Sequence, residues 1–77
     1  PQTGAHMSTL RPEEIAKIQA YLERKFQNKG FTLKMREKAK DSAEVLLNNE
    51  FIGLVYKDED DGEVSFDFNM AILSEDL

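Results

Sequence analysis

FIGLVYKDEDDGEVSFDFNM, residues 51–70, is the stretch of the chain that decides the fold. Its second half alternates apolar and polar side chains, which is typical of a strand with one face in a core. Its first half, Phe51 to Tyr56, is apolar at nearly every position, which indicates a central strand covered at least in part on both faces. Between them, Asp61-Gly62 favours a two-residue hairpin turn, because such a turn requires positive φ at both central residues.

The register of this hairpin follows from parity. If Asp61-Gly62 is the loop, Asp60 pairs with Glu63 and Val55 with Phe68. Paired residues share a face of the sheet. One face therefore carries Phe51, Gly53, Val55, Val64, Phe66, Phe68 and Met70. Ile52, Leu54 and Tyr56 point to the opposite, outer face.

The preceding segment predicts one helix and two more strands. Pro12 opens the helix, and Gly30 is expected to end it as the residue just after its last turn. One stripe of this helix is apolar, formed by Ile15, Ile18, Leu22 and Phe26. Alternating patterns then predict a first strand over Phe31 to Arg36 and a second over Ala43 to Leu47. A three-residue loop, 48–50, would pair Leu47 with Phe51.

These elements give an α+β fold in which one N-terminal helix packs on a four-stranded antiparallel meander sheet. The alternative is a bent sheet closed into a small barrel, which Gly53 in a central strand would permit. The expected inner layer consists of Ile15, Ile18, Leu22, Phe26, Phe31, Leu33, Met35, Val45, Leu47, Phe51, Val55, Val64, Phe66, Phe68 and Met70. Ala71 to Leu77 either extends the last strand or forms a short helix capped by Ser74.

Length and composition limit the protein to one small domain. The chain has 77 residues and no cysteine, which excludes disulfides and thiolate chemistry and suits a reducing, cytoplasmic compartment. We interpret residues 1–6 as a cloning remnant ahead of Met7, which leaves residues 7–77 as the single domain. The only histidine, His6, lies in that remnant.

No catalytic constellation is visible, so we expect a non-enzymatic protein with no catalytic residues, no cofactor and no bound metal. The acidic run Asp58 to Asp61 could attract a hard cation. Its spacing does not match a calcium-binding EF-hand loop, however, and a solvated hairpin tip that discourages edge aggregation explains it more simply.

Charge is unevenly distributed along the chain. Residues 11–40 carry nine basic and four acidic side chains, whereas residues 41–77 carry one basic and eleven acidic ones. The alternative function, an anion- or RNA-binding regulatory domain, would use Lys34, Arg36, Lys38 and Lys40 as anion contacts. The chain is acidic overall, with a net charge of −5, so we do not expect nucleic acid as a partner. We favour the simpler explanation that the basic helix and first strand offset the acidic hairpin, within the molecule or between two copies paired head to tail.

The outer face offers the strongest candidate for binding. It carries an apolar strip, hereafter the outer strip, formed by Leu46, Ile52, Leu54 and Tyr56. Contiguous exposed apolar residues mark interaction sites, so we expect a partner interface here, with a homodimer or another protein as the partner and no membrane contact. The alternative is that Ile72, Leu73 and Leu77 fold back over the strip.

Three segments carry a family resemblance: Glu50 to Gly53, the acidic turn with Gly62-Glu63, and the tail Met70 to Leu73. Together with the opening RPEEIAKIQAYLERKF, they make the chain similar to a family of short alphaproteobacterial proteins of unknown function. The resemblance covers nearly the whole chain from Met7. It implies a bacterial cytoplasmic protein, and it brings no activity, cofactor or catalytic residue.

Overall fold

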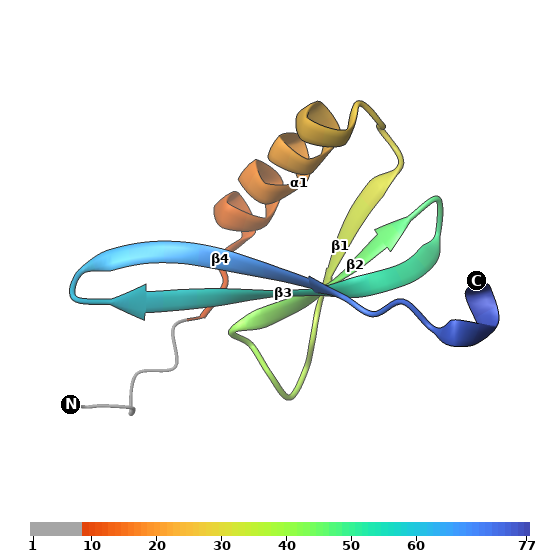
Figure 1. The fold of residues 1–77 in the computed structure, drawn as a ribbon. Helices are drawn as coiled ribbons and strands as arrows, with labels where there is room; N and C mark the ends of the chain where they lie inside the picture. Colours follow the sequence, from red (N-terminus) through yellow and green to blue (C-terminus); the bar gives the residue numbers. More distant parts are fainter. Residues whose placement is uncertain (1–8) are drawn as a thin grey trace.

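A computed structural model describes residues 9–77, and it confirms the α+β prediction (Figure 1). Helix α1 (Pro12–Phe26) is followed by β1 (Phe31–Met35), β2 (Ser42–Leu47), β3 (Glu50–Asp60) and β4 (Glu63–Met70). The four strands form one antiparallel sheet in the order β1-β2-β3-β4, and the sheet does not close into a barrel. The proposed cloning remnant, with His6, lies outside the described residues.

Helix α1 begins as the sequence predicts but ends earlier. The Arg11 backbone N–H donates to Glu14 Oε1 over 2.9 Å, which satisfies one amide of the first turn. The helix ends at Phe26, and Gln27 takes the left-handed conformation at φ 52°. The prediction that Gly30 ends the helix is therefore wrong. Gly30 instead donates its N–H to Asn28 Oδ1 over 2.8 Å, in the turn that leads into β1.

The β3–β4 hairpin has the predicted register. Asp60 pairs with Glu63, and Val55 pairs with Phe68. Asp61 and Gly62 have φ values of 52° and 80°, as a two-residue turn of this kind requires. The even loop length therefore places Val64, Phe66 and Phe68 on the same face as Val55.

The β2–β3 connection differs from the prediction. Leu47 pairs with Glu50 rather than Phe51, across a two-residue turn in which Asn48 and Asn49 both have positive φ. The register then shifts, because Val45 pairs with Gly53 whereas Leu46 pairs with Phe51. Ile52 is thus the extra residue of a β-bulge. The shorter turn and the bulge compensate, so Ala43 and Val45 still lie on the inner face.

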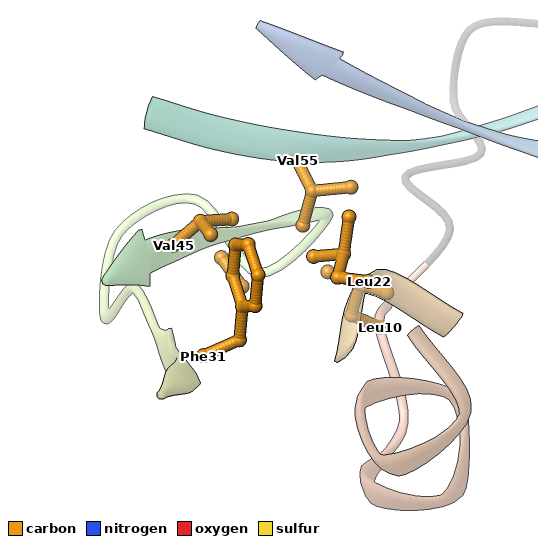
Figure 2. Packing of buried hydrophobic residues seen from close by; sticks show 6 residues of the cluster. Leu10, Leu22, Phe31, Val45 and Val55 are labelled. Atoms are coloured by element: carbon orange, nitrogen blue, oxygen red, sulfur yellow. The ribbon is translucent and has the colours of Figure 1, made fainter. Parts of the chain in front are cut away.

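The core is small and lies between one face of α1 and the centre of the sheet. Figure 2 shows Leu10 and Leu22 directed toward Phe31, Val45 and Val55, and these five residues are buried together with Ala43. Leu10 is held by its buried side chain and also by its backbone N–H, which donates to the Lys40 carbonyl over 2.8 Å. It precedes the helix and was not among the predicted core residues.

Several residues predicted for the inner layer are exposed: Phe26, Met35, Phe51, Val64, Phe66 and Met70. Phe51 is exposed because the bulge at Ile52 turns it to the outer face, whereas Val64, Phe66 and Met70 of β4 are exposed because of where the helix lies. α1 packs along β1, at one edge of the sheet, and not over β4 at the other edge. The single helix is too narrow to cover four strands, so the inner surface of β4 is left open to solvent.

The C-terminal segment turns into a short 3₁₀ helix, Ser74–Asp76, after β4. Ile72, Leu73 and Leu77 are all exposed, so they do not fold back over the outer strip. Across residues 9–77, no helix combines the length and the apolarity needed to span a membrane.

Candidate interaction surface

An open apolar groove runs between α1 and the β3–β4 hairpin, on the inner side of the sheet. Its volume is about 520 Å³. The helix contributes Glu14, Lys17, Ile18, Tyr21 and Leu22, β3 contributes Val55, and β4 contributes Val64, Phe66 and Phe68. We call this feature the β4 groove. It exists because the apolar alternation of β4 faces the helix without reaching it.

The β4-side wall of the groove is a row of large apolar side chains. Val64 is 45% exposed and Phe66 is 37% exposed, while Phe68 is half-buried against the core. On the helix side, Tyr21 is 49% exposed, with the Arg24 guanidinium 5.6 Å from its ring centroid. An amphipathic ring beside a cation is typical of residues that anchor protein interfaces.

One end of the groove is fixed by an ion pair between β3 and α1. Lys57 Nζ lies 2.9 Å from Glu14 Oε2 and 3.1 Å from Oε1, and it also donates to the Thr9 carbonyl over 3.3 Å. The two side chains are only 8% and 14% exposed. The pair therefore ties the first turn of the helix to the β3–β4 hairpin and sets how far apart the groove walls lie.

The same contacts set the protonation of Glu14. Burial alone would raise its pKa. The hydrogen bonds from Lys57 and from the Arg11 amide, with the positive charges of both side chains, oppose burial and hold the pKa of Glu14 below its ordinary value. Glu14 is therefore ionised at neutral pH, and the end of the groove carries a compensated pair of charges.

The residues of the outer strip are less exposed than expected. Leu46, Leu54 and Tyr56 are half-buried, and Ile52 packs against the core because the bulge changes its face. Phe51 takes the place beside Leu46 and is 54% exposed. The structure thus brings Leu46, Leu54 and Tyr56 onto one face and removes Ile52 from it.

The candidate anion-binding residues fall into two places. Lys34 lies on β1 opposite Glu44, whereas Arg36, Lys38 and Lys40 follow in the β1–β2 connection. Arg36 Nη1 donates to the buried Ser42 hydroxyl over 3.1 Å, which gives it a structural role at the start of β2. Lys34, Lys38 and Lys40 are exposed.

Metal ligands do not converge in the part of the chain that the structure describes. No three His, Cys, Asp or Glu side chains of residues 9–77 lie together as a metal site would require. The acidic residues Asp58 to Asp61 are spread along the exposed end of the hairpin.

Three features of the site escaped the sequence reasoning, and only Leu10 left a signal. Leu10 and Ile15 flank the first turn of α1 at the two positions of a hydrophobic staple, and that spacing identifies Leu10 as a packing residue. The β-bulge at Ile52 left no comparable signal. The groove itself depends on where the helix lies across the sheet, which periodicity does not specify.

Comparison with known proteins identifies a family and nothing further. No curated protein and no solved structure matches the chain. A family model described as "Protein of unknown function (DUF3126)" matches residues 14–76, which include most of α1 and all four strands. The chain therefore belongs to the DUF3126 family.

Proposed function

We propose that the protein is a non-enzymatic interaction module that forms a homodimer through the β4 groove, within the cytoplasm. The observation that supports this proposal is the contiguity of Tyr21, Val64 and Phe66, all of them exposed, around an apolar groove. Contiguous apolar surface of this kind mostly marks interaction sites in soluble proteins.

A second copy of the chain is the occupant that the surface favours. β4 is an edge strand, with β3 on one side and no strand of residues 9–77 on the other. Its outward backbone groups and its exposed apolar row therefore lie on the same element. A partner that adds a strand here satisfies the backbone groups and buries the side chains together. The chain's own β4 has that alternating pattern.

The small core gives a physical reason for association. Only six hydrophobic residues are buried in the described chain, and small domains are marginally stable on their own. Burial of Val64, Phe66 and Tyr21 between two copies would supply apolar contacts that one helix cannot provide. Association of this kind stabilises the folded state as concentration rises.

The test is the oligomeric state of the native chain and of two matched variants, measured by sedimentation equilibrium over a range of concentrations. Phe66→Asp places a charge in the groove, and Phe51→Asp places the same charge on the outer strip. Both phenylalanines are exposed enough for the variants to fold, which circular dichroism checks. We expect a dimer for the native chain and Phe51→Asp, and a folded monomer for Phe66→Asp.

Two results would contradict the proposal. A native chain that stays monomeric at the highest concentration would show that the proposed homodimer does not form. A dimer that survives Phe66→Asp but is lost with Phe51→Asp or Leu54→Glu would move the interface to the outer strip, where the sequence first suggested it.

An anion- or RNA-binding role is the second candidate, supported by the exposed Lys34, Lys38 and Lys40 in and beside one connection. An electrophoretic shift of RNA that weakens with salt and disappears in Lys34→Glu would support it. The absence of a shift at physiological salt would remove it.

A further inference from the structure

The open edge of β4 has a property beyond its exposure, because the strand is complementary to itself in one antiparallel register. The following inference rests on the proposed homodimer and specifies its geometry. β4 reads Glu63-Val64-Ser65-Phe66-Asp67-Phe68-Asn69-Met70, with its apolar residues on the groove side. A two-fold pairing must keep those sides together, since a shift by one residue would turn them to opposite faces.

Like charges discriminate among the registers that meet this condition. With Asp67 on the two-fold axis, the two Asp67 carboxylates would face each other. With Ser65 on the axis, Asp67 would face Glu63 of the other copy. Like charges directly opposite are destabilising. With Phe66 on the axis, Asp67 faces Ser65, Glu63 faces Asn69 and Val64 faces Phe68, so no carboxylates are opposed.

Overlap length separates the remaining candidates. Placing Phe68 on the axis also avoids opposed carboxylates, but it leaves Val64 opposite Ile72, which lies beyond the end of β4. The Phe66 register pairs seven residues of each strand, from Glu63 to Asn69, within the limits of β4. It also brings the two exposed Phe66 rings together at the centre.

The geometry points to a dimer in which two β4 strands pair antiparallel with Phe66 on the two-fold axis, which joins the two sheets into one of eight strands. Both helices then lie on one side of this sheet, since both grooves face the same way. The groove of each copy continues into that of the other, and Val64, Phe66 and Phe68 of both copies form a shared apolar layer.

The chain lacks cysteine, so disulfides can form only between the cysteines that are introduced to test the register. Ser65 and Asp67 lie on the outer side, away from the groove, and both are exposed. In the proposed register, Ser65 faces Asp67 of the other copy at a Cα separation of about 4.5–5.5 Å, which a disulfide can bridge. Two Ser65 residues lie diagonally, at about 7–8 Å, which is too far.

The experiment mixes Ser65→Cys with Asp67→Cys under mild oxidation and identifies the cross-linked species by mass. We expect the mixed disulfide to form several-fold faster than either homodimeric disulfide. Thr32→Cys, exposed on the opposite edge strand β1, replaces Asp67→Cys as the matched control and should give only slow, collisional cross-linking.

The outcomes separate this inference from the proposal beneath it. A native dimer with preferential Ser65–Asp67 cross-linking supports the register. A native dimer whose mixed and homodimeric cross-links form at equal rates overturns the register and leaves the homodimer in place. A native chain that sediments as a monomer overturns both.

Discussion

Replacement of Lys57 by methionine tests how the groove is held open. The substitution keeps an unbranched apolar side chain of similar length and removes the ammonium group. That group contacts both carboxylate oxygens of Glu14, at 2.9 and 3.1 Å, and the Thr9 carbonyl at 3.3 Å. Glu14 would remain largely buried, at 14% exposure, without the cation that compensates its charge.

The magnitude follows from the exposure of the pair. Loss of one partner from a fully buried pair costs about 3–5 kcal/mol, whereas an exposed pair contributes about 0–1 kcal/mol. At 8% and 14% exposure, Lys57 and Glu14 lie between these limits, and we expect Lys57→Met to lower the free energy of unfolding by about 2 kcal/mol. In a domain of this size, that corresponds to a decrease in Tm of roughly 8–16 °C.

The assay is thermal unfolding followed by circular dichroism at neutral pH. Lys29→Met is the matched control, because Lys29 is exposed in the turn after α1, and its Tm should change little. Glu14→Gln completes a double-mutant cycle, and this substitution should lower the Tm less in the Lys57→Met background than in the native chain. A Tm for Lys57→Met equal to that of Lys29→Met would refute the reasoning.

The pH dependence has a definite sign. The pKa of Glu14 is lower in the folded protein than its ordinary value, so its contribution to stability is present above the unfolded pKa. It is lost as pH falls through the folded pKa. The difference in Tm between the native chain and Lys57→Met should therefore shrink on acidification. A difference that stays constant would show that Glu14 is not the group responsible.

Three further results are expected. Gly53→Ala should destabilise the fold by about 1–3 kcal/mol, because a Cβ atom at Gly53 would collide with the Asn69 carbonyl oxygen. Urea unfolding measures this loss, and an unchanged midpoint would contradict the close approach. Because Asn49 has φ 69°, Asn49→Val should lower the free energy of unfolding by about 1–2 kcal/mol in the same assay, and Asn49→Gly should leave it unchanged. Equal stability of the two variants would be inconsistent with the turn. Added salt should strengthen the dimer in sedimentation equilibrium, because each copy carries a net charge of −5 and screening weakens the repulsion between copies; dissociation by salt would instead indicate an interface held by opposite charges.

Local chemistry made the hairpin predictable. Asp61-Gly62 specifies a turn of even length, and the alternation of β4 then fixes which side chains join Val55 on the inner face. The structure has that register. The same reasoning failed at the next turn, because Asn48-Asn49-Glu50 is compatible with either a two- or a three-residue loop. The bulge at Ile52 compensates for the shorter turn, so the β2 residues keep their predicted faces, whereas Phe51 and Ile52 exchange theirs.

The position of the groove could not be predicted, because it is a property of packing between distant segments. The apolar stripe of the helix shows that α1 covers a sheet, but not which strands it covers. Leu10 anchors the start of the helix over the β1–β2 connection through the Lys40 carbonyl, and α1 then runs along β1. This position of the helix leaves Phe66 exposed, although its alternation with polar neighbours is typical of a core residue.

The most direct test of the β4 groove as a self-association surface is a series of amide correlation spectra of the native chain at increasing concentration. We expect concentration-dependent shifts at Val64 to Phe68 and at Tyr21, together with slower hydrogen exchange at the outward amides of β4. The amides of β1 and of the outer strip should stay unchanged. Spectra that do not change with concentration, or shifts centred on Phe51 and Leu54, would contradict the account.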